Sequence, residues 1–112
     1  MFGLFRKRKD PNVARNDAIR AELAAKGDDG STVRRVIHRT VPSPAGDINS
    51  TVVQDFLAIQ GFEVVPGESG GFDFAEKRAV AGADFDSRTA ELEKALEGWR
   101  WSYEGWTRPA QG

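Results

Sequence analysis

The segment WRWSYEGW, residues 99–106, decides the fold of this 112-residue chain, because it holds all three tryptophans and the only tyrosine. Side chains alternate between the two faces of a β-strand. A strand over residues 99–103 therefore places Trp99, Trp101 and Tyr103 on one face, opposite the polar residues between them. This apolar face predicts the last strand of a sheet with its core beneath, and the alternative is an exposed aromatic surface for a partner.

Trp106 falls outside this alternation, because it follows Gly105. We predict that Trp106 clamps the end of the strand against a turn at residues 28–31. The alternative is a partner-facing anchor, since tryptophan is enriched at the centres of protein interfaces.

Two helices are predicted upstream of this strand, and each has an apolar stripe at helical spacing. The helix at residues 83–98 has Asp84 or Asp86 as its N-cap and ends at Gly98. The helix at residues 47–60 has Asp47 or Ser50 as its cap and ends at Gly61. The stripe of the first consists of Phe85, Thr89, Leu92 and Leu96, and that of the second of Ile48, Val52, Phe56 and Ile59.

Three more strands are predicted from β-branched and alternating residues. They cover residues 32–41, 62–66 and 71–80, and the last two form a hairpin across the turn-rich GESGG. Neither face of the strand at 32–41 is cleanly apolar, so its orientation stays open. A leading helix starts with Asp10 as N-cap and Pro11 and runs to Gly27, with a thin apolar stripe of Ile19 and Leu23.

The order after the leading helix is β-α-β-β-α-β, which predicts an α+β, ferredoxin-like split βαβ fold. Two helices then cover one face of a four-stranded antiparallel sheet. We expect residues 10–112 to form this one domain and residues 1–9, MFGLFRKRK, to form a flexible basic head. A weak membrane-surface role for the head is the alternative, since apolar residues precede its four positive charges.

Composition excludes several classes of function. The chain has no cysteine and one histidine, so disulfides and thiolate metal sites are ruled out. Outside the head, 17 acidic residues face 12 basic ones, which argues against a general nucleic-acid binder. No apolar run is long enough to span a bilayer, and we expect a cytoplasmic protein.

The residues that bear chemistry suggest no enzyme. His38 lacks a second histidine or a cysteine, so we expect a structural role, and Asp28 and Asp29 favour a turn over a calcium loop. Phe72 and Phe74 resemble the RNA-stacking aromatics of RRM domains only weakly, because no basic residue leads them. We therefore expect no catalytic residues, no metal and no cofactor.

Four short motifs carry a family resemblance: GDDGS at 27–31, RRVIH at 34–38, GFEV at 61–64 and YEGW at 103–106. Over roughly residues 18–107 the chain resembles the RraB family, the regulators of ribonuclease activity B. This resemblance implies a ferredoxin-like, non-enzymatic protein inhibitor that binds ribonuclease E and alters messenger-RNA decay. The matching positions are Asp28, Asp29, Gly30, Ser31, His38, Gly61, Phe62, Tyr103, Gly105 and Trp106.

Two functional hypotheses remain. The first is a protein-binding regulator, whose partner would be ribonuclease E or its degradosome scaffold, as the resemblance implies. The second is a small RNA-binding module that uses exposed arginines. Those arginines are Arg34, Arg35, Arg39, Arg100 and Arg108. The charge balance favours the first hypothesis.

Overall fold

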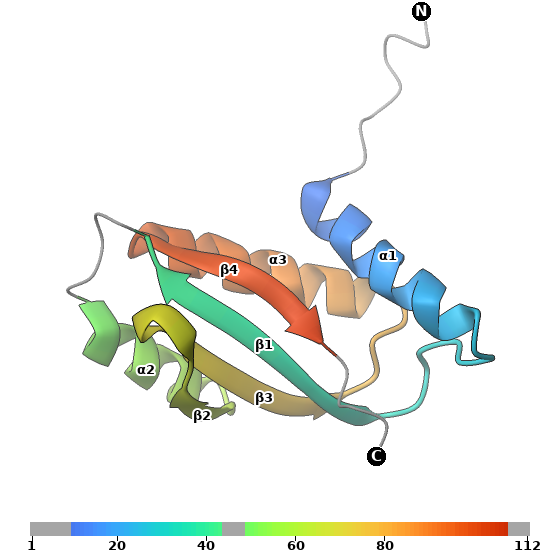
Figure 1. Cartoon of the computed structure of the whole chain (residues 1–112), viewed down its shortest axis with the longest axis horizontal. Coiled ribbons are helices and arrows are strands. Elements are labelled where there is room, and N and C mark those ends of the chain that lie inside the picture. Colours follow the sequence, from blue (N-terminus) through green and yellow to red (C-terminus); the bar gives the residue numbers. More distant parts are fainter. Residues whose placement is uncertain (1–9, 44–48, 108–112) are drawn as a thin grey trace, which may run out of the picture.

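The computed structural model describes residues 10–43 and 49–107, so the predicted head at 1–9 lies outside it. Its elements follow the predicted order (Figure 1). They are α1 (Pro11–Ala24), β1 (Arg34–Pro42), α2 (Ser50–Ile59), β2 (Glu63–Pro66), the 3₁₀ turn η3 (Glu68–Gly70), β3 (Phe72–Arg78), α3 (Ala83–Gly98) and β4 (Trp101–Thr107).

The four strands form one sheet in the order β2-β3-β1-β4, and every neighbouring pair is antiparallel. This confirms the predicted α+β architecture, and the strand order is compatible with a ferredoxin-like fold. In Figure 1, β1 and β4 pass in front of α3, so α3 backs one face of the sheet. The extra helix α1 packs against α3.

Strand β1 turns its less apolar face toward the helices, which settles the orientation left open by the sequence. Val36, His38 and Thr40 are buried, whereas Arg35 and Arg39 are exposed on the other face. The neighbouring strands explain this choice, because His38 lies opposite Phe74 of β3 and Thr40 opposite Tyr103 of β4. The buried polar residues of β1 are therefore set among aromatic rings.

The predicted stripe of α2 is wrong. Val53 and Leu57 are fully buried, whereas Val52 is 45% and Ile59 is 81% exposed. Phe56 is half-buried, and Ile48 lies outside the described residues. The helix carries apolar residues on two neighbouring flanks. The flank with Val53 and Leu57, which are four residues apart, is the one that packs on the sheet.

The caps agree with prediction only at α1, where the Asp10 side chain accepts a hydrogen bond of 2.8 Å from the Asn12 amide. Asn49 is the N-cap of α2 in place of Ser50, and the predicted Asp47 lies outside the described residues. Gly82 is the N-cap of α3, in place of the predicted Asp84 or Asp86. These two residues lie in the first turn, where their negative charges interact favourably with the helix dipole. Of the helices in the described ranges, none has the length and apolar character needed to cross a membrane.

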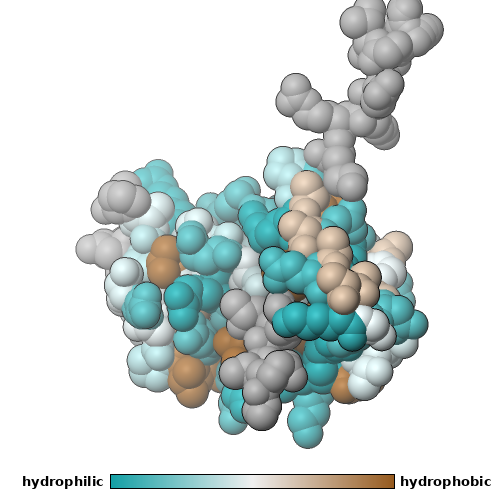
Figure 2. Space-filling model, turned by 45° about the vertical axis from the view of Figure 1, so that its right-hand side comes forward, coloured by the Kyte–Doolittle hydropathy of each residue, from teal (hydrophilic) through white to brown (hydrophobic). Residues whose placement is uncertain are grey.

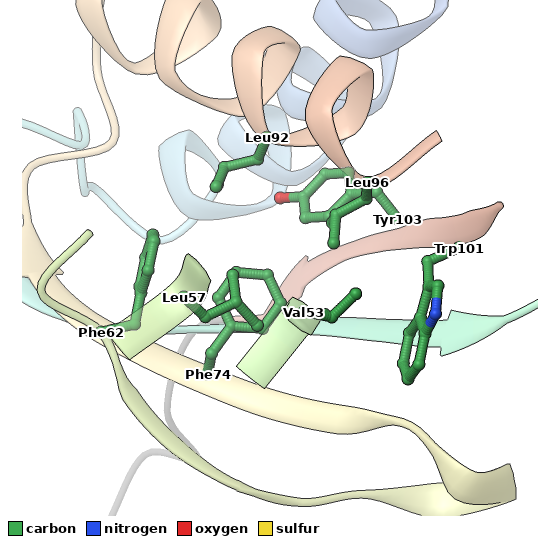
Figure 3. Close-up of a cluster of buried hydrophobic side chains, with 8 residues drawn as sticks. All are labelled: Val53, Leu57, Phe62, Phe74, Leu92, Leu96, Trp101 and Tyr103. Carbon is green, nitrogen blue, oxygen red and sulfur yellow. The ribbon is translucent and has the colours of Figure 1, made fainter. Parts of the chain in front are cut away.

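The core has two clusters of buried side chains. The aromatic cluster lies under α2 and the second half of α3 (Figure 3). It consists of Val53, Leu57, Phe62, Phe74, Leu92, Leu96, Trp101 and Tyr103. The α1 cluster lies where α1 and the first half of α3 meet the sheet. It consists of Leu23, Val36, Val80, Phe85 and Trp106. In the view of Figure 2, a narrow band of pale brown runs down the right-hand part of the molecule, and the deep brown of the most hydrophobic residues is confined to small separate spots.

Candidate functional site

The aromatic face of the last strand belongs to the core, as the alternation predicts. Trp101 and Tyr103 of β4 are 2% and 4% exposed and sit in the aromatic cluster. Trp99 does not belong to the strand, which corrects the prediction. It is the C-cap of α3, half-buried against Phe56, and the chain reverses at Arg100 with φ of 65°. The strand therefore begins two residues later than predicted.

Trp106 also points into the core, because β4 contains a bulge. The register with β1 shifts between His38 and Thr40, so that Tyr103 lies opposite Thr40 and Trp106 opposite His38. Gly105 adopts φ of 97° within this bulge, a conformation that favours glycine. The extra residue returns Trp106 to the face of Trp101 and Tyr103. The bulge explains why Trp106 falls outside the alternation and is nevertheless only 3% exposed.

The partners of Trp106 lie on α1 and α3, which corrects the predicted clamp against the turn at 28–31. The indole Nε1–H donates to Asn16 Oδ1 at 2.7 Å, and the ring meets Phe85 edge to face at 4.9 Å. Asn16 in turn donates to Asp86 Oδ1 at 2.8 Å and Thr89 Oγ1 at 2.9 Å. Trp106 therefore fastens α1 to the body of the fold.

The turn at residues 28–31 is built as the sequence suggests. Asp28 accepts from the Gly30 amide at 2.9 Å, and Asp29 accepts from the Ser31 amide at 3.0 Å. Arg34 donates to both carboxylate oxygens of Asp28 at 2.7 and 2.8 Å. The Gly30 carbonyl accepts from the amide of Val80, a member of the α1 cluster. The turn thus supports the same half of the core as Trp106 without meeting it directly.

His38 is fully buried and bonded on both ring nitrogens. Nδ1 lies 2.7 Å from the Tyr103 hydroxyl and Nε2 lies 3.0 Å from Glu76 Oε2. The carboxylate has no proton to donate, so Nε2–H donates to Glu76, and the Tyr103 hydroxyl donates to Nδ1. Burial lowers the pKa of His38 despite the neighbouring carboxylate, and burial raises the pKa of Tyr103. The neutral imidazole is the form that fits this site.

Glu76 on β3 connects His38 to two arginines. Its Oε1 lies 3.1 Å from Arg78 Nε and 3.2 Å from Arg88 Nη2. Burial alone would raise the pKa of Glu76, but the His38 hydrogen bond and the Arg88 charge outweigh it and lower the value to about 2. This buried carboxylate is therefore ionised and compensated.

Gly61 and Phe62, two of the positions on which the family resemblance rests, complete this site. Gly61, with φ of 96°, follows α2 and turns the chain toward β2. Phe62 then meets the His38 ring edge to face at 5.5 Å and lies under the Arg88 guanidinium at 4.6 Å. His38, Phe62 and Tyr103, which are far apart in sequence, thus share one site. It is closed to solvent, because the side chains of His38 and Glu76 are 0% and 9% exposed.

The opposite face of the sheet has no helix over it within the described residues, and we call it the open face. Its arginines on β1 pair with acids of β2, β3 and η3. Arg35 lies 3.1 Å from Glu63, and Arg39 lies 3.0 Å from Asp73 and 3.6 Å from Glu68. Since Phe72 and Phe74 face the core, this surface has no aromatic pair on β3 for stacking bases.

A shallow hollow lies on the open face beside the bulge. It has a volume of about 260 Å³ and is lined by Ile37, Arg39, Asp73, Glu104, Gly105 and Trp106. An aliphatic floor with charged walls suits a long polar side chain from a partner better than a small apolar ligand. Among the described residues, no cluster of histidine, aspartate and glutamate could hold a metal ion.

Several residues that build these sites were not predicted. Asn12 and Asn16 are buried on α1, and Glu76 and Arg88 form the ion-pair network around His38. The only signal in the sequence was the thin apolar stripe of α1, which indicates that the helix needs other contacts to stay docked.

The sequence matches no protein-family model and no curated protein.

Proposed function

We propose that this protein is a non-enzymatic, protein-binding regulator that receives its partner on the open face of the sheet. The partner class implied by the RraB resemblance is a ribonuclease E-type enzyme or its degradosome scaffold, so the proposed outcome of binding is a change in messenger-RNA decay. We infer the partner from the family resemblance and the binding surface from the properties of the open face.

The observation that carries the proposal is the pattern of charge on the open face. The basic side chains Arg35, Arg39 and Lys77 alternate there with acidic ones, Glu63, Glu68, Asp73 and Glu104. Two apolar residues lie among them: Ile37 is half-buried, and Val65 is 47% exposed. A mosaic of both signs with apolar residues between is typical of a specific protein surface, because it sets orientation through complementary charge.

The same pattern weighs against RNA as the ligand. Binding to phosphates needs cations that are free to displace the counterions of the nucleic acid. The first three candidate arginines, Arg34, Arg35 and Arg39, are already paired with carboxylates. Arg100 is exposed on the turn before β4, and Arg108 lies outside the described residues. The RNA hypothesis therefore rests on too few accessible charges.

An affinity capture from native lysate, with and without added ribonuclease, tests the proposal. The bait is the full chain, and a ribonuclease E-type enzyme should be retained after the RNA has been digested. Loss of every captured protein on ribonuclease treatment would instead support the RNA-binding module.

A charge-swap variant tests the surface. Exchanging Arg39→Asp together with Asp73→Arg keeps an ion pair across β1 and β3 and the net charge, but it reverses the pattern. We expect at least a tenfold loss of affinity for the captured enzyme, about 1.4 kcal/mol. The control is Lys26→Gln, on the exposed turn after α1, which should leave the affinity unchanged. Equal affinity for the swap and the control would exclude the open face as the binding surface.

A further inference from the structure

The helix layer carries an apolar strip that no described element covers. Val52 and Ile59 are exposed, and Phe56 lies between them on the same flank of α2, because residues i, i+4 and i+7 share a helix face. The Phe56 ring meets Trp99 at 5.1 Å. We call Val52, Phe56, Ile59 and Trp99 the α2–α3 strip. Its residues lie on the side of the sheet away from the open face.

The N-terminal segment joins the fold within reach of this strip. A hollow between α1 and α3 is lined by Asp10 and Asn12 on one side and by Glu93, Lys94 and Glu97 on the other. Asp10, the residue to which the segment is joined, therefore lies beside Glu93 and Glu97 of α3. Nine extended residues span about 30 Å, whereas a helix with its side chains is about 10 to 12 Å across. The segment is long enough to cross α3 and reach the strip.

The surface that it would cross is suited to a basic chain. Glu91 and Glu97 are exposed on α3, and neither has an ion-pair partner among the described residues. Gly98 is exposed between Glu97 and Trp99 and presents no side chain to block the crossing. The exposed Lys94 lies between Glu91 and Glu97, so the outer face of α3 is net acidic, and Gly98 leaves a low passage toward the strip.

The order of residues in the segment matches this path. The four basic residues Arg6 to Lys9 come first after Asp10, and Phe5, Leu4 and Phe2 follow at a greater distance. Basic groups would then lie over the acidic face of α3 and apolar groups over the strip. An anionic membrane fits less well, because three acids, Asp10, Glu93 and Glu97, outnumber the one base, Lys94, around the point where the segment leaves the fold, and their net negative charge would be repelled by it.

We propose that residues 1–9 bind in cis across α3, with Arg6 to Lys9 on Glu91 and Glu97 and with Phe2 and Phe5 on the α2–α3 strip. The segment covers the exposed apolar residues of α2. The inference is independent of the proposed function, because the partner surface lies on the other face of the sheet.

Because the chain has no cysteine, a single introduced cysteine gives one defined position for a spin label. A nitroxide on Gly3→Cys in the full chain should strongly broaden the backbone NMR signals of residues 52–59 and 99. Signals of Arg35 and Lys77 on the open face serve as the internal reference and should keep their intensity. Raising the salt concentration should restore the broadened signals in part, because ion pairs hold the basic part of the segment.

Two sets of variants complete the test. Val52→Gln with Ile59→Gln should abolish the broadening without unfolding the chain, since both positions are exposed, and Val33→Gln, 63% exposed outside the strip, is the matched control. Glu91→Gln with Glu97→Gln should weaken the broadening and remove its salt dependence. Uniform or absent broadening in buffer would overturn the proposal. So would broadening that arises only between a labelled and an unlabelled molecule, or capture of the segment by phosphatidylserine vesicles while the strip stays uncovered.

Discussion

The two halves of the core bury their aromatic residues equally well but hold them by different means. In the aromatic cluster, Trp101 stacks on Phe72 at 5.6 Å, and Phe62 meets Phe74 edge to face at 4.9 Å. In the α1 cluster, Trp106 meets one ring and donates a hydrogen bond to a buried asparagine. The contacts of Trp101 depend on apolar area, which tolerates small shifts, whereas those of Trp106 depend also on hydrogen-bond geometry, which does not. The docking of α1 is therefore the more specific of the two.

Removing the largest side chain of the aromatic cluster should have the greatest effect. Trp101→Ala deletes a buried indole that is 2% exposed, and we expect a loss of about 3 to 5 kcal/mol in the free energy of unfolding. Urea denaturation followed by circular dichroism measures it. Trp99→Ala is the matched control, because Trp99 is only half-buried and should cost clearly less. Equal costs for the two variants would mean that Trp101 contributes no more than a surface aromatic.

The hydrogen bond of the α1 cluster should show as coupling between two variants. Asn16→Ala leaves the Trp106 indole N–H buried without its acceptor, so we expect a loss of about 2 to 3 kcal/mol. Once Trp106→Phe has removed that donor, the same Asn16→Ala change should cost less. A double-mutant cycle by urea denaturation gives the difference, and strictly additive costs would show that the hydrogen bond contributes nothing specific.

His38 lies between the two halves, 5.0 Å from the Phe74 ring and 6.4 Å from the Phe85 ring, and it should make stability depend on pH. Its pKa is lowered in the fold, so below about pH 6.5 the unfolded chain takes up a proton that the folded chain resists. Stability should therefore fall on acidification from there, by at most about 1.4 kcal/mol per pH unit. The contribution of Glu76 adds a second loss only below about pH 4.5, since its folded pKa is about 2.

The two windows can be separated with His38→Gln. This variant should show a flat stability between about pH 6.5 and 5 while it keeps the loss at lower pH, measured by urea denaturation at a series of pH values. An unchanged slope in the upper window would assign that pH dependence to groups other than His38.

The smallest effect is expected at the bulge that directs Trp106 into the α1 cluster. Gly105→Ala places a Cβ at φ of 97° and 2.9 Å from Arg15 Cδ. The long arginine side chain can move aside, so backbone strain should dominate, at about 1 to 2 kcal/mol. Thermal unfolding monitored by tryptophan fluorescence tests this. Gly98→Ala is the control, because a Cβ there meets nothing within 4 Å and should be neutral or stabilising.

The sequence predicted the buried face of α3 better than those of α2 and α1, for physical reasons. The stripe of α3, Phe85 to Leu96, has one apolar face and was predicted in full. The α2 stripe was misassigned because Val52 and Val53 are adjacent, and in a ten-residue helix both flanks look equally apolar. Asn12 and Asn16 could not be recognised, because asparagine is ordinarily exposed and only the partners Asp86 and Trp106 explain its burial.

The candidate site was predictable in part as well. The sequence predicts a structural role for His38, which is buried and hydrogen-bonded on both ring nitrogens, but its partner Glu76 carries no signal until β1 and β3 are placed in register. The bulge left one trace in the sequence, since a glycine within a strand often marks such an interruption.

The bulge in β4 also makes this edge of the sheet unfavourable for pairing with a second copy of the protein. β4 and β2 are the two outer strands of the sheet, and an outer strand with regular spacing would pair with a strand of a second molecule and extend the sheet. In β4 the irregular register at Gly105 breaks that spacing, and β2 has only four residues and ends in Pro66, which has no amide to donate. Both borders of the sheet are thus poor templates for fibre growth, and a partner must recognise side chains rather than extend the backbone ladder.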